Sequence, residues 1–246
     1  MAAIAKKIVL ITGANSGIGF ELAHQLLTKG HHVLVGSRTV EKGKTAVQEL
    51  QSRNLAGTAE LVHLDVTDDS TITAAASTIS SAHGKLDILI NNAAVAVPSG
   101  TDREQLNSAF DTNATGPYIL TNALLPSLLK SPSGARVVNV SSGIGSIGRK
   151  LDPTGPFHKV SSVPYRASKT ALNMVTACQF VELGEMGIKV FLYDPGFTVS
   201  NLSEHNTVER GARSAKDSVL PLVDVIEGKR DGECGLFLHN TGTWPW

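Results

Sequence analysis

The chain has few cysteines, and the pattern of the two it has excludes several classes of protein. Cys178 and Cys234 lie far apart among 246 residues, with no Cys-x-x-Cys pair and no histidine at zinc-site spacing. A disulfide-stapled scaffold is therefore not expected, and we interpret both residues as reduced, buried thiols of a cytoplasmic protein. The eight histidines also show no ligand spacing, so we expect no metal site.

The chain also lacks net charge and long apolar runs. Lysine plus arginine and aspartate plus glutamate number 22 each, so the charge gives no reason to expect a nucleic acid or an anionic membrane as partner. No apolar run reaches the roughly 20 residues of a transmembrane helix. The N-terminal sequence leads straight into a predicted strand without a separate signal core. We therefore expect a cytoplasmic protein whose partner is a small molecule.

What the chain does contain is a regular alternation of apolar runs and helical patterns. The runs are continuously apolar, which indicates strands buried on both faces and hence a parallel sheet. The alternation predicts an α/β fold in which residues 1–246 form a single doubly wound, Rossmann-type domain, with a mainly parallel seven-stranded sheet flanked by helices.

The expected elements follow directly from these patterns. Strands are predicted at residues 7–12, 32–36, 59–63, 87–91, 136–140, 189–193 and 234–238. Helices are predicted at residues 17–29, 40–53, 69–83, 102–129 and 164–184, the fourth with a kink at Pro117. Two segments rich in turn-forming or polar residues, at about 143–163 and 197–216, are expected to be surface loops on the substrate side.

A glycine-rich loop follows the first predicted strand. In residues 12–19, Gly13, Gly17 and Gly19 permit a tight turn, close approach of the backbone to phosphate, and close packing of helix on strand. The next helix begins at this loop, so its free N–H groups and its dipole face an anion. This context favours dinucleotide binding over a purely structural turn. The expected cofactor contacts in the loop are Gly13, Asn15, Ser16, Gly17, Ile18 and Gly19.

The end of the second predicted strand indicates which dinucleotide is bound. An acidic side chain at this place would bind the ribose 2′-hydroxyl of NAD and repel a 2′-phosphate. Here the sequence has Ser37 and Arg38 and no acid. Because a guanidinium matches the geometry of a phosphate and Ser37 adds a hydroxyl, the pattern favours NADP(H).

Tyr165 and Lys169 lie four residues apart in a predicted helix, so they share one face. A free phenol titrates near pH ~10, and a neighbouring ammonium lowers that pKa toward a useful range. Ser142 can supply a second hydrogen bond to a substrate oxygen. A Tyr-x-x-x-Lys pair alone is common as a solvated pair, so it becomes informative only through the motifs around it.

The order and spacing of these motifs resemble the short-chain dehydrogenase/reductase family, and its carbonyl reductases, over nearly the whole chain. The motifs are Thr12-Gly13-x-x-x-Gly17-Ile18-Gly19, Asp65-Val66, Asn91-Asn92-Ala93-Ala94, Asn113, Ser142, Tyr165-x-x-x-Lys169 and Asp194-Pro195-Gly196. The chain departs from the family in having Ala94 where glycine is usual, and in a longer connection between Ser142 and Tyr165. Neither departure removes a catalytic residue.

The resemblance implies a catalytic tetrad of Asn113, Ser142, Tyr165 and Lys169. Ser142 is implied because the family's serine is the second of the pair that ends strand five. A carbonyl oxygen would accept hydrogen bonds from Ser142 and Tyr165, hydride would come from the nicotinamide, and Tyr165 would donate the proton. Lys169 would hold the ribose and lower the pKa of Tyr165, while Asn113 would hold a water on a proton relay to Lys169.

The resemblance also implies how the rest of an NADP(H) cofactor would be held. Asp65 would bind the adenine amino group with Val66 beside the ring, and Asn91 would stabilise the sheet next to the cofactor. The loop from Pro195 would receive the nicotinamide carboxamide. The implied cofactor contacts outside the glycine loop are Ser37, Arg38, Asp65, Val66, Asn91, Ala93, Tyr165, Lys169, Pro195, Gly196, Thr198 and Ser200.

Together these inferences predict an NADPH-dependent reductase of ketones or aldehydes, or the reverse alcohol dehydrogenase. Two alternatives stay open: an epimerase, dehydratase or cyclase on the same scaffold, and a dinucleotide-binding regulator without turnover. The resemblance further implies a homodimer or homotetramer paired through the helices at 102–129 and 164–184. The tail at residues 243–246 carries two tryptophans and is predicted to dock on a neighbouring subunit or on its own chain.

Overall fold

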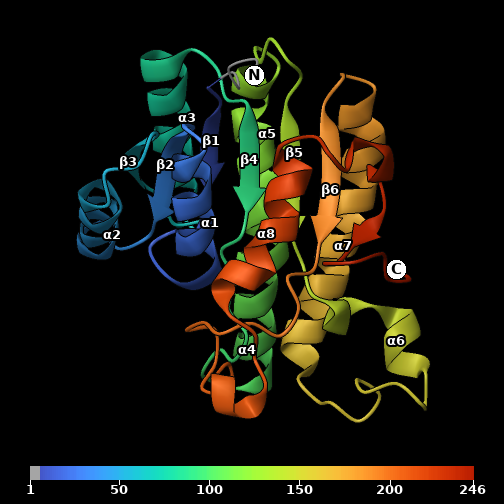
Figure 1. The fold of residues 1–246 in the computed structure, drawn as a ribbon. Helices are drawn as coiled ribbons and strands as arrows, with labels where there is room; N and C mark the ends of the chain where they lie inside the picture. Colours follow the sequence, from blue (N-terminus) through green and yellow to red (C-terminus); the bar gives the residue numbers. More distant parts are fainter. Residues whose placement is uncertain (1–5) are drawn as a thin grey trace.

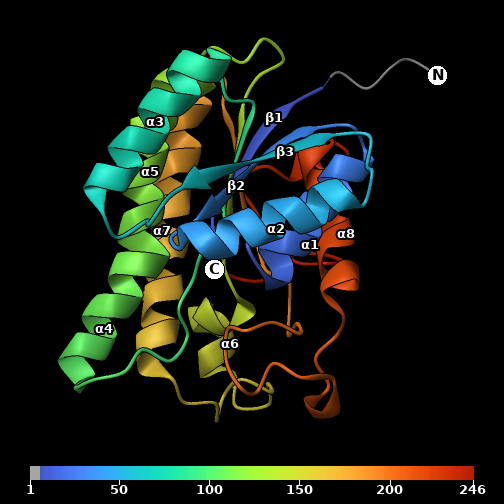
Figure 2. The ribbon, with the colours of Figure 1, turned by 90° about the vertical axis from the view of Figure 1, so that its left-hand side faces the viewer.

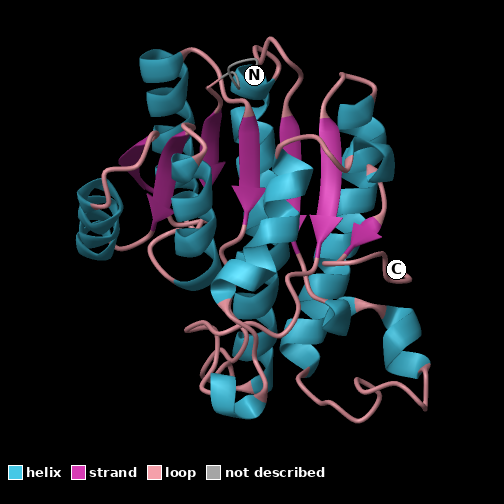
Figure 3. Cartoon of the chain, viewed as in Figure 1, coloured by secondary structure: helices cyan, strands magenta, loops and turns pink. Residues whose placement is uncertain are grey.

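Residues 6–246, which the computed structural model describes, form a seven-stranded sheet between two layers of helices (Figures 1 and 3). The strand order is β3-β2-β1-β4-β5-β6-β7, and every neighbouring pair is parallel. The predicted doubly wound fold is thereby confirmed. The strands are β1 (Ile8–Ile11), β2 (His32–Ser37), β3 (Thr58–His63), β4 (Ile88–Asn91), β5 (Arg136–Val140), β6 (Lys189–Tyr193) and β7 (Phe237–Leu238).

Both faces of the central strands are buried, which explains their continuous apolar sequence. In β1, Val9 and Ile11 belong to the core on one face of the sheet, while Leu10 belongs to the core on the other. All three side chains are fully buried. Because side chains alternate between the faces of a strand, two cores require apolar residues at successive positions.

Two layers of helices supply the partners for these cores (Figure 2). Helices α1, α2 and α8 cover one face, whereas α3, α4, α5 and α7 lie on the other. The helices are α1 (Gly17–Thr28), α2 (Val40–Ser52), α3 (Asp69–His83), α4 (Asp102–Phe110), α5 (Gly116–Leu128), α6 (Ile147–Leu151), α7 (Val163–Gly184) and α8 (Ala215–Ile226). Short 3₁₀ turns occur at Gly143–Gly145, Val208–Arg210 and Asp231–Glu233.

The predicted long helix at residues 102–129 is observed as one helical run that contains an irregular turn. A π-helical turn, Asp111–Thr115, separates α4 from α5, and Pro117 follows it in the first turn of α5. The π-helical turn runs directly into α5, and the N–H of Gly116 donates to the Asp111 carbonyl. The kink at Pro117 stays a prediction, and the irregular turn beside it is one of the kind often found at functional sites.

Three other expectations need correction. Helix α8 was not predicted, although its buried residues Val219, Leu222, Val223 and Ile226 follow helical spacing and pack beside α1. The expected last strand is reduced to two residues in β7. Cys178 is exposed on α7 rather than buried, and Cys234 is partly buried.

The order in which strands are added to the sheet reverses between β1 and β4, because β2 and β3 lie on one side of β1 and β4 lies on the other. This reversal creates a place where a ligand can bind. In parallel α/β sheets, ligands bind in the crevice beyond the carboxyl ends of strands where the order reverses. In Figure 1 the arrowheads of the strands point to the lower edge, where the connecting loops gather. Within residues 6–246, no helix is both long enough and apolar enough to cross a membrane. The predicted absence of a signal core concerns partly residues 1–5, which lie outside the described residues.

Candidate active site

A cavity of about 740 Å³ opens at the carboxyl edge of the sheet and brings most of the predicted site residues together. Its walls come from the loops after β1, β2, β3, β4, β5 and β6 and from the start of α7. The predicted residues that line it are Gly13, Asn15, Ser16, Gly17, Ile18, Arg38, Asp65, Val66, Ala93, Ser142, Tyr165, Lys169, Pro195, Gly196, Thr198 and Ser200. Four other predicted residues do not line the cavity, and these are Gly19, Ser37, Asn91 and Asn113.

The glycine loop is shaped by close backbone contacts. Gly13 has a φ of 63°, a conformation that side chains beyond glycine rarely adopt. A Cβ atom on Gly19 would come within 2.6 Å of the Asn92 amide nitrogen and 2.7 Å of the Gly13 carbonyl oxygen. That amide donates a 2.8 Å hydrogen bond to the Thr12 carbonyl, so it ties the loop to the end of β4. Gly19 therefore sets the packing of the loop without facing the cavity.

The N-terminus of α1 points its free N–H groups toward the cavity. Ser16 occupies the N-cap position, but its side chain makes no capping hydrogen bond, and the first turn contains no acidic residue. The orphan N–H groups and the positive end of the helix dipole are thus available to an anion. These features fit the pyrophosphate of a dinucleotide.

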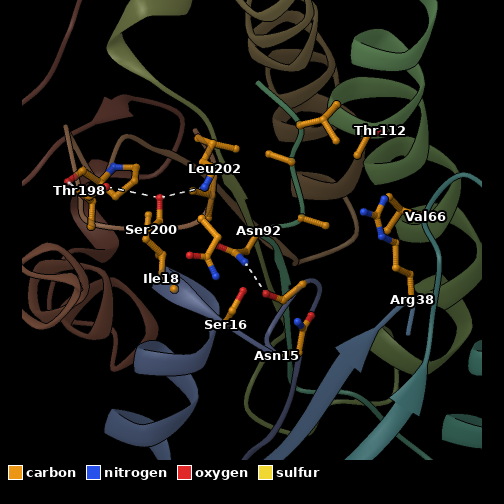
Figure 4. A pocket seen from close by; sticks show the side chains of 18 of the residues that line it. Asn15, Ser16, Ile18, Arg38, Val66, Asn92, Thr112, Thr198, Ser200 and Leu202 are labelled. Carbon is orange, nitrogen blue, oxygen red and sulfur yellow. Dashed lines mark hydrogen bonds between the residues drawn. The ribbon is translucent and has the colours of Figure 1, made fainter. Parts of the chain in front are cut away.

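Arg38 lies at the rim of the cavity, and Figure 4 shows it beside Val66, far across from Thr198 and Ser200. Its neighbour Ser37 does not share this position. The Ser37 side chain is 1% exposed, and its hydroxyl donates a 2.9 Å hydrogen bond to the Thr39 carbonyl. The predicted phosphate contact from the Ser37 hydroxyl stays a prediction, whereas Lys42 on α2 lines the cavity and was not predicted.

Asp65 and Val66 follow β3 and line the cavity, as their predicted place beside an adenine requires. One carboxylate oxygen of Asp65 accepts hydrogen bonds from the backbone N–H and the hydroxyl of Thr67, at 3.0 Å and 2.8 Å. These two bonds hold the carboxylate in one orientation. The contact of Asp65 with adenine stays a prediction.

Lys169 is the most deeply buried cation of the site. It is 2% exposed, and its ammonium donates a 2.8 Å hydrogen bond to the carbonyl of Val140 at the end of β5. Burial lowers the pKa of Lys169 to about 7, against an opposing effect of the Asp194 carboxylate. The side chain can therefore gain or lose a proton near neutral pH.

Tyr165 lies one helical turn before Lys169, with the ammonium 5.8 Å from the centre of its ring. Burial raises the pKa of the Tyr165 phenol, the Asp194 carboxylate raises it further, and the side chain of Ser142 opposes the shift. The expected lowering of this pKa by Lys169 does not appear, because burial and a carboxylate dominate. Tyr165 is consequently protonated at neutral pH, the form that can donate a proton.

Asn113 lies in the π-helical turn and is fully buried. Its side-chain oxygen accepts a 2.9 Å hydrogen bond from the N–H of Val95, and its amide donates to the Val95 carbonyl at 2.8 Å and to the Ser168 hydroxyl at 2.9 Å. The amide thus links the chain after β4 to α7. Its predicted part in a proton relay stays a prediction, while the observed bonds give it a positioning role beside Tyr165.

Asn91 lies at the end of β4 but faces the interior of the sheet instead of the cavity. Its amide donates to the Asn139 side chain at 2.8 Å and to the Thr121 hydroxyl at 3.2 Å. Asn139 in turn donates to Thr176 and Gln179 on α7. This buried network joins β4, β5 and α7 and agrees with the expected stabilisation of the sheet, although direct contact with a cofactor is not supported.

Asp194 was quoted in a motif, but no role was predicted for it. It is 5% exposed and lines the cavity at the end of β6. One carboxylate oxygen accepts a 2.8 Å hydrogen bond from the N–H of Gly196, and the other accepts one of 2.8 Å from the indole of Trp244. The carboxylate therefore holds the Pro195–Gly196 turn and connects it to the C-terminal tail.

The tail lies against its own chain, which is one of the two positions predicted for the aromatic residues. Trp244 stacks on His239 with ring centres 3.9 Å apart, and the Arg149 guanidinium lies 3.6 Å from the centre of the Trp244 ring. The same guanidinium lies 4.1 Å from the ring centre of Phe157. Tail, α6 and the long loop before α7 are thus held together by one aromatic and cationic stack.

This geometry defines an α/β protein built to hold a dinucleotide next to a serine, a tyrosine and a lysine. Its sequence matches the family described as short chain dehydrogenase over residues 7–210. A short-chain dehydrogenase, anuI, of Penicillium roqueforti is 40% identical over 230 residues, covering 91% of this chain and 89% of the relative. The short-chain dehydrogenase/reductase tropE of Talaromyces stipitatus is 34% identical over 261 residues, covering 96% of each chain.

The solved structures lead to the same family. The NADPH-bound carbonyl reductase from chicken fatty liver superposes with a TM-score of 0.82 and 28% identity, covering 99% of this chain and 100% of that one. The protein therefore belongs to the short-chain dehydrogenase/reductase family of oxidoreductases, which use a nicotinamide dinucleotide. The family resemblance predicted from the motifs is confirmed.

Proposed function

We propose that this protein is an NADP(H)-dependent reductase that converts a ketone or an aldehyde to an alcohol. The observation that carries the proposal is the single cavity that Tyr165, Ser142 and Lys169 share with the glycine loop of α1. A protonated Tyr165 supports reduction, because that direction needs a proton donor at the substrate oxygen. The chicken enzyme with 28% identity carries NADPH and is named a carbonyl reductase, which agrees with this assignment.

The residues at the rim of the cavity support the choice of NADP(H) over NAD(H). Arg38 and Lys42 both line it, and the strand before Arg38 ends in the buried Ser37, so no acid lies at the place where NAD is usually selected. A guanidinium can bind a 2′-phosphate through two parallel hydrogen bonds. Glu41 lies nearby in the first turn of α2, so the preference depends on the two cations outweighing this carboxylate.

In the proposed reaction, bound NADPH supplies a hydride to the carbonyl carbon. Ser142 and Tyr165 donate hydrogen bonds to the substrate oxygen, where negative charge develops as the hydride arrives. Tyr165 then transfers its proton to that oxygen and completes the alcohol. Lys169 lies one helical turn from Tyr165, and a pKa near 7 lets it return a proton at neutral pH.

NADPH oxidation across a panel of ketones, aldehydes and quinones tests the proposal. We expect NADPH-dependent reduction of at least one carbonyl compound, with an alcohol as the product detected by mass spectrometry. Conversion of a substrate without net change in NADPH would instead place the protein among the epimerases, dehydratases or cyclases. Binding of NADPH with no turnover on any substrate would favour the regulator.

We further propose that two copies pair through α4, α5 and α7, as the family resemblance implied. These helices lie on one side of the sheet and expose large apolar side chains, which are Phe110, Tyr118, Leu129, Met174, Phe180 and Val181. A surface of this kind favours a two-fold interface between equal copies. Light scattering at micromolar concentration should give the mass of a dimer or tetramer, and Met174→Glu should shift it toward the monomer. A wild-type monomer would contradict the proposal.

A further inference from the structure

Two histidines and a glutamate converge at the edge of the sheet opposite the cavity. His32 begins β2, Glu60 lies in β3, and His83 is the last residue of α3. One ligand atom from each lies within 4.8 Å of the others. A strand rises about 3.3 Å per residue, so the six positions between His32 and Arg38 place this cluster roughly 20 Å from the cofactor rim.

The side chains of the cluster are held in defined orientations. The Nε2 atom of His83 lies 2.7 Å from one Glu60 oxygen, and the Nε2 atom of His32 lies 3.6 Å from the other. On its opposite side, the Nδ1 atom of His32 is 2.6 Å from the Thr58 hydroxyl. A hydrogen bond at Nδ1 fixes the ring and leaves Nε2 as the atom directed at the cluster.

The Nε2 atom of His32 is buried and has no hydrogen-bond partner within residues 6–246. A buried polar atom without a partner is costly, and it calls for a ligand, an ion or a water. The atom faces a second imidazole and a carboxylate, and this set of groups suits a transition metal better than any other ligand.

We propose that His32, Glu60 and His83 form a binding site for a divalent transition-metal ion, with zinc as the reference metal. Zinc binds histidine nitrogen and carboxylate oxygen at about 2.0–2.2 Å, so neighbouring ligand atoms of a tetrahedral site lie roughly 3.4 Å apart. The 3.6 Å separation of His32 Nε2 and Glu60 matches this spacing, and the His83–Glu60 pair has to open by less than an ångström. Water would fill the fourth position, because Glu60 is 42% exposed.

The local charges allow a cation to bind at neutral pH. Burial lowers the pKa of His32, while Glu60 opposes and His83 and Lys6 support the shift. An imidazole binds metal in its neutral form. The carboxylate of Glu60 would offset one positive charge of the ion. The nearby ammonium of Lys6 would oppose the binding of a cation.

A bound ion would join the C-terminus of α3 to β2 and β3. An ion that binds the folded chain better than the unfolded chain raises the melting temperature. The site lies away from the cavity, so occupancy should leave cofactor binding and turnover unchanged. The site therefore differs from the reductase proposal, and either can fail without the other.

Isothermal titration of the chelator-treated protein with zinc chloride, followed by thermal unfolding with and without zinc, tests the site. We expect one equivalent of tight binding and a higher melting temperature in wild type, and the loss of both in His32→Gln and in His83→Gln. His24→Gln is the matched control, because His24 lies 3.5 Å from Glu21 on α1 in a pair that lacks a third ligand. Cobalt in place of zinc should give the visible absorption of a tetrahedral site only when both His32 and His83 are present.

Three results would overturn the proposal. The first is the absence of zinc binding by the wild-type protein. The second is binding of equal strength in His83→Gln, which would place the ion at other histidines or at the exposed Cys178. The third is loss of binding in the control His24→Gln. If His32, Glu60 and His83 form only a hydrogen-bonded cluster, zinc will leave the melting temperature of wild type and variants unchanged.

Discussion

The two walls of the cavity are built in different ways. The cofactor wall, made by residues 13–18, 38–42 and 64–66, presents backbone N–H groups, glycines and the exposed Arg38. The catalytic wall, made by residues 140–142, 165–169 and 194–200, holds the buried ionisable side chains Lys169 and Asp194. Tyr165 lies between these two groups, and its pKa responds to burial and to the Asp194 carboxylate.

The comparison shows that one wall acts through shape and the other through electrostatics. A backbone turn can bind a phosphate where glycines let the chain approach and a helix begins. Salt and solvent screen the exposed charge of Arg38 at the rim of the cavity. On the catalytic wall, low polarity amplifies every charge, so the loss of one group changes the proton affinity of its neighbours. Substitutions on the two walls should therefore separate binding from turnover.

The largest effect is expected for Tyr165→Phe, which removes the proton donor and keeps the ring. General acid catalysis contributes about 10²–10⁴-fold, so turnover should fall at least that far. NADPH affinity, measured by fluorescence titration, should stay near wild type because the cofactor wall is untouched. Retention of most activity by Tyr165→Phe would refute the mechanism. Tyr118→Phe on the exposed face of α5 is the control and should leave turnover unchanged.

Substitutions of two other residues on the catalytic wall should have effects that differ from that of Tyr165→Phe. Ser142→Ala removes one hydrogen bond to the developing oxyanion and should reduce turnover less than Tyr165→Phe. Lys169→Ala should reduce both turnover and NADPH affinity, because the resemblance gives that side chain a ribose contact as well. If Ser142→Ala lowered only NADPH affinity, the catalytic wall would be acting in binding and the comparison of the two walls would fail.

A second prediction concerns the cofactor wall, where Arg38→Ala should change binding and leave chemistry intact. A hydrogen bond to a charged group is worth about 1.5–3 kcal/mol, so kcat/KM for NADPH should fall roughly 10–100-fold. The value for NADH should change little, because NADH has no 2′-phosphate. Steady-state kinetics with both cofactors measure this difference. Equal losses for the two cofactors, or a wild-type preference for NADH, would refute the proposed role of Arg38.

A third prediction uses stability to test the buried charge of the catalytic wall. Burial lowers the pKa of Lys169 from 10.5 to about 7, so the unfolded chain binds a proton between these values that the folded chain lacks. The free energy of unfolding therefore rises with pH across this window. Methionine cannot titrate, so Lys169→Met lacks this rise. Over about two pH units above 7, wild type should gain roughly 2–3 kcal/mol relative to the variant.

Denaturant unfolding at several pH values measures this difference. Lys189→Met is a suitable control, because Lys189 is 46% exposed on β6 and its ammonium is not in the cavity. The control keeps Lys169 and should therefore show the same rise above pH 7 as wild type. Parallel pH dependence of wild type and Lys169→Met would show that Lys169 stays charged in the folded state.

The cofactor wall was predictable because it depends on spacing along the chain. Gly13, Gly17 and the strand–helix context indicate the phosphate loop without any knowledge of distant residues. Spacing alone does not predict the contact made by Ser37, whose hydroxyl donates to the Thr39 carbonyl. Spacing predicts which residues follow a strand, but not which way a short side chain turns.

The catalytic wall was only partly predictable, because its chemistry depends on contacts between distant segments. The motifs identified Tyr165 and Lys169, but the direction of the Tyr165 pKa shift depends on burial and on Asp194, which folding brings close. The cluster of His32, Glu60 and His83 was missed for the same reason, since its members lie on three elements. Helix α8 differs, because its apolar spacing was present in the sequence and was overlooked.

The smallest predicted effect tests whether the C-terminal tail belongs to the catalytic wall. Trp244→Phe keeps an aromatic ring beside His239 and Arg149 but removes the indole N–H that donates to Asp194. A carboxylate that loses a hydrogen-bond donor has a stronger electrostatic effect on its neighbours. Asp194 raises the pKa of both Tyr165 and Lys169. The pH profile of kcat should therefore move to higher pH, with kcat at neutral pH reduced by less than about tenfold, equivalent to roughly 1.4 kcal/mol.

Trp246→Phe is the matched control, because Trp246 is 42% exposed and its ring centre lies 6.0 Å from that of Phe237. If the tail acts through Asp194, Trp244→Phe moves the pH profile and Trp246→Phe does not. If the tail only stabilises the fold, Trp244→Phe lowers the melting temperature and leaves the profile in place. Trp244 lies 50 residues beyond Asp194 in the chain and belongs to none of the family motifs. A shifted pH profile would therefore show that the catalytic wall includes the C-terminal tail as well as the residues that the family pattern implies.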